Sequence, residues 1–151
     1  MNNNSEKPIY ITNDKEFIPD NFVVNALVYD NTDRILLLKR KEKHTYYPGY
    51  WSVVMEKVQD GETFDDALYR GINEELGILI QADKAGKMED DLKKVWKGKK
   101  YQIRRYFVGI DDERVFVEAD LDKYIWFERD SDGNIDIMPD SMDMIQEFWS
   151  R

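Results

Sequence analysis

Residues 56–78 read EKVQDGETFDDALYRGINEELGI, and this stretch decides the fold. It predicts a turn around Gly61 that leads into a short acidic helix over residues 64–76. Apolar residues recur there at every fourth position and form one stripe along the helix: Phe64, Leu68, Ile72 and Leu76. The pattern therefore predicts an amphipathic helix that buries one face.

The ends of this helix are also marked in the sequence. Thr63 is a suitable N-cap residue, and Asp66 stands three positions later as its capping-box partner. Gly77 is placed to end the helix, since glycine readily adopts the left-handed conformation that closes a helix.

The pair Glu74–Glu75 is the chemically informative part of the helix. Two adjacent carboxylates repel each other, and a divalent cation removes that repulsion while gaining oxygen ligands. Arg70 lies one turn before Glu74 and could orient the carboxylates through charge-assisted hydrogen bonds. For the glutamate pair taken alone, a solvated acidic helix face is the alternative. Gly71 stands where such a metal site would use another acid.

Composition sets the outer limits. The chain has 151 residues, 42% of them hydrophobic, which suits one domain with a real core. Cysteine is absent, so disulfides, thiolate metal sites and cysteine nucleophiles are excluded, and a reducing compartment fits. A net charge of −9 disfavours binding to nucleic-acid polymers. The sequence shows no signal peptide and no apolar run long enough for a membrane span.

The remaining elements follow from local patterns. Strands are predicted at 8–11 (an edge strand), 22–29, 34–39, 51–55, 92–96, 100–110, 115–118 and 124–128. The strands at 22–29 and 34–39 read as a hairpin around a turn at 30–33. A C-terminal helix is expected over 140–149, capped by Asp140. This order predicts an α+β fold rather than a regular βαβ series.

The 56–78 segment resembles the Nudix box, G-x5-E-x7-R-E-U-x-E-E-x-G-U, where U is a bulky aliphatic residue. Seven of its nine fixed positions are filled here, by Glu62, Arg70, Ile72, Glu74, Glu75, Gly77 and Ile78. The resemblance implies a Nudix-type α/β/α sandwich with a mixed β-sheet. Residues 21–151 would form this single domain, and residues 1–20 an N-terminal segment that is loose or adds an edge strand.

The family hydrolyses nucleoside diphosphates linked to another moiety, and it uses Mg²⁺ or Mn²⁺. The resemblance implies that Glu74 and Glu75 bind the metal and that Arg70 orients them. It also implies a metal contact from the backbone carbonyl of Met55 and a supporting role for Glu62. Many members add an acid from a later loop, for which Asp120 is the candidate and Glu118 the alternative.

Two positions depart from the box. Glu56 stands at the first glycine position, and Gly71 replaces the glutamate that follows Arg70. In many family members that missing glutamate is a metal ligand or general base, so its loss bears on activity. We hypothesise that Glu56 reaches into the space left at Gly71 and acts as the substitute acid. The alternative is an exposed glutamate that points away.

Two basic segments are candidates for substrate contact. Residues 40–50 form a loop that combines Arg40 with aromatic residues such as Tyr47 and leads to Trp51, which suits a phosphate and a stacked base. The alternative for this loop is a surface whose tyrosines cover the edge of the core. The lysine-rich stretch over 93–105 either attracts an anionic substrate or forms the outward face of a hairpin.

The predicted function is divalent-metal-dependent hydrolysis of a diphosphate linkage in a small nucleotide or a related nucleoside diphosphate derivative. The alternative is a catalytically impaired Nudix-fold module that binds a nucleotide or a protein, and Gly71 motivates it. Isopentenyl-diphosphate isomerases resemble this fold too, but their chemistry uses a cysteine and this chain has none. The expected partner is a small phosphorylated molecule, with no membrane, a cytoplasmic location and, as in many relatives, a homodimer.

Overall fold

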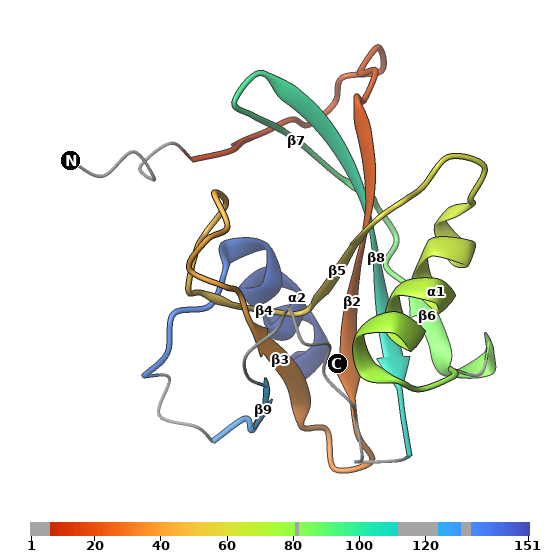
Figure 1. Cartoon of the computed structure of the whole chain (residues 1–151), viewed down its shortest axis with the longest axis vertical. Helices are drawn as coiled ribbons and strands as arrows, with labels where there is room; N and C mark the ends of the chain where they lie inside the picture. The colour runs from red at the N-terminus through yellow and green to blue at the C-terminus, as the bar shows by residue number, and fades with distance from the viewer. Residues whose placement is uncertain (1–6, 81, 112–123, 131–133) are drawn as a thin grey trace.

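A mixed sheet of nine strands lies between two helices in the computed structural model, which describes residues 7–80, 82–111, 124–130 and 134–151. Helix α1 (Phe64–Leu76) covers one face of the sheet and α2 (Pro139–Trp149) the other (Figure 1). This α/β/α arrangement confirms the predicted α+β fold class.

The strands are β1 (Ile9–Tyr10), β2 (Asn21–Tyr29), β3 (Ile35–Lys39), β4 (Trp51–Ser52), β5 (Val54–Lys57), β6 (Ala85–Lys87), β7 (Leu92–Trp96), β8 (Lys99–Gly109) and β9 (Tyr124–Phe127). They run in the order β1-β7-β8-β2-β3-β4, with β5 against β2, β6 against β8 and β9 against β3. A 3-10 turn, η2 (Ala82–Lys84), precedes β6. The predicted strand over 115–118 lies outside the described residues.

The predicted hairpin over 22–39 is only partly what the sequence suggested. β2 and β3 are antiparallel, but their recorded pairing is limited to Tyr29 opposite Ile35. Along its whole length β2 instead pairs in parallel with β8, from Asn21 opposite Tyr101 to Tyr29 opposite Gly109. The parallel partner comes from far along the chain, so local turn signals could not reveal it.

The prediction of one continuous strand over 51–55 is wrong, because the structure has two short strands there. The segment divides at Val53 into β4, which pairs with β3, and β5, which pairs with β2. Val53 is buried at the break, where its N–H donates to the hydroxyl of Ser141 on α2. The break lets consecutive residues join two different neighbours, and it brings β5 beside α1.

Helix α1 forms as predicted. The Thr63 hydroxyl accepts from the N–H of Asp66, and the Asp66 carboxylate accepts from the N–H of Thr63, which completes the capping box. Gly77 ends the helix with φ of 71° in the left-handed region. The apolar stripe packs Leu68, Ile72 and Leu76 against the sheet, together with Val24, Ala26 and Val28 of β2.

Helix α2 begins one residue earlier than expected, and its predicted cap is wrong. Pro139 is its first residue, and Met138 occupies the N-cap position without a side-chain hydrogen bond. The Asp140 side chain does not cap the helix, because it is turned into the molecule and accepts hydrogen bonds from Lys94 and Tyr10. The ion pair with Lys94 therefore takes the place of a hydrogen bond to the helix end.

Other predictions agree with the structure. The edge strand appears as β1, the strand over 92–96 as β7, and the basic stretch forms the β7–β8 hairpin around Lys97 and Gly98. Among the described residues, no helix is both long and apolar enough to span a membrane.

Candidate active site

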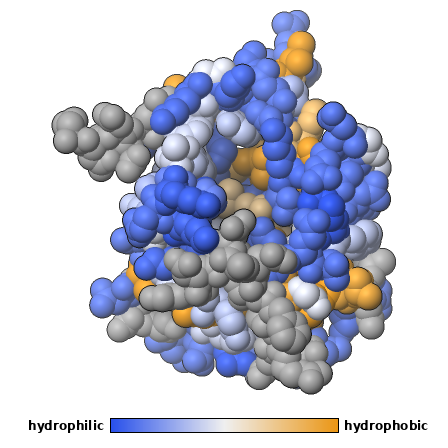
Figure 2. All heavy atoms as spheres, in the orientation of Figure 1, coloured by the Kyte–Doolittle hydropathy of each residue, from blue (hydrophilic) through white to orange (hydrophobic). Residues whose placement is uncertain are grey.

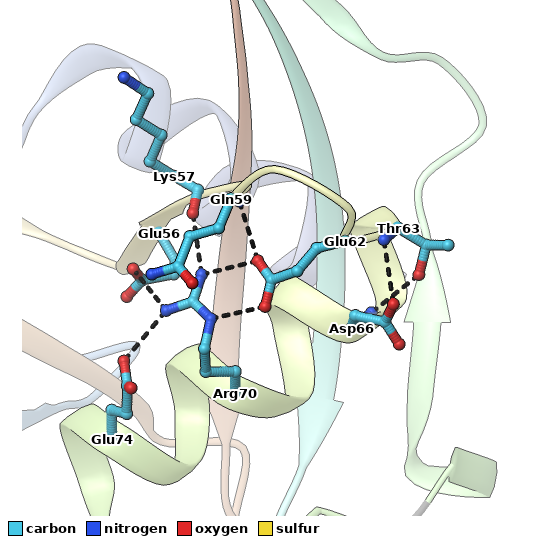
Figure 3. A network of polar contacts seen from close by, with 8 residues as sticks. All are labelled: Glu56, Lys57, Gln59, Glu62, Thr63, Asp66, Arg70 and Glu74. Carbon is cyan, nitrogen blue, oxygen red and sulfur yellow. Dashed lines mark hydrogen bonds and ion pairs between the residues drawn. The ribbon is translucent and has the colours of Figure 1, made fainter.

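Arg70 is the centre of the site (Figure 3). Its Nε and Nη2 donate to the two oxygens of Glu62 at 2.7 and 3.0 Å, which is the bidentate geometry that arginine favours. Its Nη1 donates both to Glu56 and to Glu74, each at 3.0 Å. The backbone carbonyl of Lys57 accepts from Nη2 at 2.9 Å and fixes the guanidinium plane.

Three segments therefore meet at one guanidinium: β5 with Glu56, the loop before α1 with Glu62, and α1 itself with Arg70 and Glu74. The hydrogen bonds from Arg70 lower the pKa of Glu62. The hydrogen bonds to Glu62, Glu56 and Glu74 in turn raise the pKa of Arg70. The site thus holds three acidic side chains close together around one guanidinium. The predicted contact of Arg70 with Glu74 is present, and the structure adds the contact of Arg70 with Glu62.

Alternation along β5 sends neighbouring side chains to opposite faces of the sheet. Glu56 points toward α1, with its side chain 19% exposed, and lies directly over Gly71. Met55 points to the other face, where it contributes to a pocket. The acidic site and the pocket therefore share one strand.

Arg40 lies beside two residues that line the pocket, Tyr46 and Met55. Its Nε donates to the carbonyl of Tyr46 at 2.8 Å, and its Nη1 lies 4.0 Å from the sulfur of Met55. Burial lowers the pKa of Arg40, while the nearby charge of Glu75 acts in the opposite direction. A cation thus stands beside Met55 at the pocket wall, and its charge interacts with that of Glu75.

The pocket itself is a hollow of about 160 Å³ whose lining is mostly apolar and aromatic. Figure 2 shows it as a depression with hydrophobic residues at its floor and hydrophilic residues around it. It is lined by Val23, Tyr46, Met55, Lys94, Trp96, Tyr101 and Ile103. Such walls suit a ligand with a planar ring that stacks on aromatic side chains, rather than a ligand that is recognised through many hydrogen bonds.

A buried ion pair forms one side of the pocket. Lys94 Nζ donates to Asp140 Oδ2 and to the Tyr46 hydroxyl, each at 2.5 Å. The Lys94 and Asp140 side chains are 5% and 2% exposed, and Tyr10 donates to the other oxygen of Asp140. Desolvation lowers the pKa of Lys94 and raises that of Tyr46. Lys94 is therefore a buried structural cation, not an outward lysine of the hairpin.

Asn25 is a second polar group that the sequence did not single out. It is fully buried on β2, opposite Met55 of β5 and Arg105 of β8. Among the described residues, neither its side-chain nitrogen nor its oxygen has a hydrogen-bond partner. Its side chain lies on the same face of the sheet as that of Val23, which lines the pocket, because side chains alternate along a strand. The sequence signal that could have drawn attention to Asn25 is a polar residue in the middle of an apolar strand.

The other predicted site residues are less close. Tyr47 stacks edge-on against Tyr46 and Tyr50 and so supports the pocket wall from outside. Trp51 packs in the core near α2 and exchanges backbone hydrogen bonds with Asp136 and Met138. Asp120 and Glu118 lie outside the described residues. The structure therefore brings Glu56, Glu62, Arg70 and Glu74 together, with Glu75 near Arg40.

The chemistry of these donors fits a hard divalent cation. Glu56 and Glu74 offer carboxylate oxygens to the same nitrogen of Arg70, and oxygen is the ligand that Mg²⁺ prefers. In this structure the carboxylates point toward Arg70. Within the part of the chain that the structure describes, no three potential metal ligands converge on one point. Side-chain rotation alone would redirect Glu74, whose side chain is 56% exposed.

Comparison with known proteins places the chain. The family model described as NUDIX domain matches residues 20–148. A curated relative, the nucleoside triphosphatase NudI of Enterobacter sp. (strain 638), is 28% identical over 118 residues, which cover 73% of this chain and 84% of that protein.

Solved structures share the fold. A MutT NUDIX hydrolase from Burkholderia pseudomallei superposes with a TM-score of 0.71 at 23% identity, covering 83% of this chain and 95% of that one. The NUDIX domain of Shewanella oneidensis NrtR, solved with ADP ribose, gives a TM-score of 0.69 at 14% identity and covers 93% of both chains.

Proposed function

This chain belongs to the NUDIX family, and from that premise we propose that it is a pyrophosphohydrolase that uses Mg²⁺ or Mn²⁺ to cleave the diphosphate linkage of a small nucleotide or a related nucleoside diphosphate derivative. The family match and the triphosphatase relative support hydrolysis of a nucleotide. The metal and the type of linkage are the finer part of the proposal.

The observation that carries the proposal is the gathering of Glu56, Glu62 and Glu74 around Arg70. Keeping several ionised carboxylates side by side is unfavourable without a cation near them. Arg70 offsets part of that repulsion and holds the acids at the end of β5 and along one face of α1. A surface helix with scattered acids would not require such a hub.

Glu74 and Glu75 would hold the metal, together with the backbone carbonyl of Met55. A bound divalent cation shields phosphate oxygens and lowers the pKa of a coordinated water. Arg70 orients Glu74, and Glu62 keeps Arg70 in place through two hydrogen bonds. Asp120 or Glu118 would add a later acid.

The pocket supports a nucleotide as the substrate. A base would stack among Tyr46, Trp96 and Tyr101. Its phosphates would then reach Arg40, which lies beside Met55 at the pocket wall and whose charge interacts with that of Glu75. Tyr47 would act by supporting Tyr46, and Trp51 by holding the loop that carries Arg40.

A second candidate function is a nucleotide-binding module without catalysis. Gly71 favours it, since the usual acid at that position is absent, and one structural neighbour was solved as a NUDIX domain bound to ADP ribose. Both candidate functions use the same pocket, so a binding measurement does not distinguish them. A measurement of turnover does, because only the hydrolase releases a product.

The experiment is a panel of nucleoside triphosphates, dinucleoside polyphosphates and nucleotide sugars, assayed with Mg²⁺, with Mn²⁺ and with EDTA. The proposal predicts metal-dependent release of phosphate, pyrophosphate or nucleoside monophosphate from at least one compound. Binding of a panel compound without turnover in either metal would instead support the module.

Location and assembly follow the same reasoning. A chain without cysteine suits the reducing cytoplasm, which also supplies nucleotides, and we expect a homodimer as in many relatives. The expected ligand is a small molecule rather than a nucleic-acid polymer, because the net charge of −9 repels long polyanions.

A further inference from the structure

Gly71 and Glu56 occupy the same space. Gly71 is buried on the face of α1 that lies against β5, and a Cβ atom built on it would lie 2.8 Å from Cγ and 2.9 Å from Cβ of Glu56. Both distances are shorter than van der Waals contact allows. The side chain of Glu56 therefore fills the position where a side chain at residue 71 would begin.

We propose that Glu56 supplies the carboxylate that the family motif otherwise places at residue 71, so that the two positions have exchanged an acid for a glycine. The inference rests on the proposed function, since it assigns the missing metal-binding acid of the same site. It explains both departures from the motif as one change. It also explains why a glycine, normally unfavourable inside a helix, is accommodated at residue 71.

The position of the Glu56 carboxylate supports the exchange. Oε2 lies 3.3 Å from the built Cβ of residue 71, and Oε1 lies 3.0 Å from Nη1 of Arg70. The same Nη1 binds Glu74 at 3.0 Å. The Glu56 carboxylate therefore lies next to residue 71 and shares one nitrogen of Arg70 with Glu74.

The backbone holds Glu56 firmly in this orientation. It lies in β5 opposite Val24 of β2, and strand alternation directs its side chain to α1 rather than to solvent. Arg70, which binds its carboxylate, is itself fixed by Glu62 and by the carbonyl of Lys57. An exposed glutamate that points away would show none of these contacts.

The first test measures metal binding directly. Mn²⁺ is titrated into the wild-type chain and into Glu56→Gln, and free Mn²⁺ is followed by electron paramagnetic resonance. We expect Glu56→Gln to weaken Mn²⁺ binding at least about tenfold. Asp60→Asn is the matched control, because it removes the same charge from an exposed position in the adjoining loop. Binding by Glu56→Gln within twofold of wild type, or no Mn²⁺ binding by the wild-type chain, overturns the inference.

The second test exchanges the residues back. Glu56→Gly should weaken Mn²⁺ binding, and Glu56→Gly combined with Gly71→Glu should restore it to within about threefold of wild type. Restoration separates a metal ligand from a mere counterion of Arg70, since the acid returns from a different element. Failure of a folded double variant to recover any affinity speaks against the exchange.

Melting temperatures give a readout without metal or substrate. Gly71→Ala should lower the melting temperature when Glu56 is present, because the new Cβ meets its side chain. The same change should raise it by about 3 °C in the Glu56→Gly background, where the helix gains alanine and loses the clash. An equal effect of Gly71→Ala in both backgrounds would refute the steric coupling.

The two proposals can fail separately. If the wild-type chain hydrolyses no panel compound but the Mn²⁺ titrations behave as expected, the exchange stands and the hydrolase proposal falls. If the wild-type chain is active and Glu56→Gln matches it in both kcat and Mn²⁺ affinity, the hydrolase proposal stands and the exchange falls.

Discussion

Arg70 is the residue that holds the acidic side chains of the site together. It makes hydrogen bonds to three carboxylates and one carbonyl, and the guanidinium is suited to this because its donors form a rigid planar fork. A lysine would offer one compact charge with no fixed plane. The pairing with Glu62 is the strongest of these contacts, since both oxygens of Glu62 are engaged.

This pairing predicts a pH dependence of stability. Hydrogen bonds from Arg70 hold the pKa of Glu62 below its usual value of 4.5. A carboxyl with a lowered native pKa stabilises the fold above its unfolded pKa, and the contribution is lost as the pH falls through the native pKa. We expect the melting temperature of wild type to exceed that of Glu62→Gln at pH 7, and the difference to shrink as the pH falls from 4.5.

Thermal unfolding from pH 7 to pH 3 checks this expectation. Asp60→Asn, an exposed acid in the same loop, controls for the loss of one negative charge. A gap between wild type and Glu62→Gln that stays constant across this range would contradict the role given to the ion pair.

Some of these residues could be predicted from sequence and others could not. The contact of Arg70 with Glu74 follows from helical spacing, whereas the family resemblance gave Glu62 a supporting role without naming its partner. Lys94 and Asp140 form an ion pair across 46 positions, and neither shows a local signal of it. Their pairing depends on how β7 and α2 are brought together by the whole fold.

Helix α1 is the element on which the site depends. Its N-terminal capping box begins it at a fixed residue, and its apolar stripe fixes its rotation against β2. Together these set the direction in which Arg70 and Glu74 point. The helix was predictable to the residue, because caps and the apolar stripe are both local features.

Removing the cap should therefore weaken the helix. Thr63→Ala deletes the hydroxyl that accepts from the N–H of Asp66, and we expect a loss of about 1 kcal/mol in the free energy of unfolding. Urea denaturation measures it. Thr45→Ala, at an exposed position in a loop, is the matched control and should stay within about 0.5 kcal/mol of wild type. A cap variant as stable as the control would show that packing alone fixes α1.

The strands were less predictable than the helix. Their existence follows from apolar and β-branched runs, but their partners do not. β2 carries the signal of a hairpin with β3, yet its long partner is β8, about 80 residues later. The break at Val53 is also invisible locally, since it arises where β4 and β5 join different neighbours.

In the whole molecule, the ion pair of Lys94 and Asp140 ties distant parts together. It joins β7 to α2, and hydrogen bonds extend it to Tyr10 of β1 and to Tyr46 in the loop that carries Arg40. The wall of the pocket is thus fixed by contacts from four segments. Its aromatic side depends on a charge pair that is almost fully removed from water.

Breaking one partner of this pair should be costly. Lys94→Met leaves the Asp140 carboxylate buried with only Tyr10 as a described partner, and we expect a loss of about 3 kcal/mol in the free energy of unfolding. Replacing both, as Lys94→Met with Asp140→Leu, should recover part of that loss because no buried charge remains. Urea denaturation of the three proteins decides it, and a Lys94→Met variant as stable as wild type would contradict the buried pair.

Steady-state turnover of wild type and of Glu75→Gln tests most directly whether this site hydrolyses nucleotides through its carboxylates. On the best compound of the panel with Mg²⁺ or Mn²⁺, we expect kcat of Glu75→Gln to fall about 100-fold, or ~3 kcal/mol, with an unchanged melting temperature. Equal kcat values for the two proteins, or no metal-dependent turnover by wild type on any compound, would rule out hydrolysis through these carboxylates.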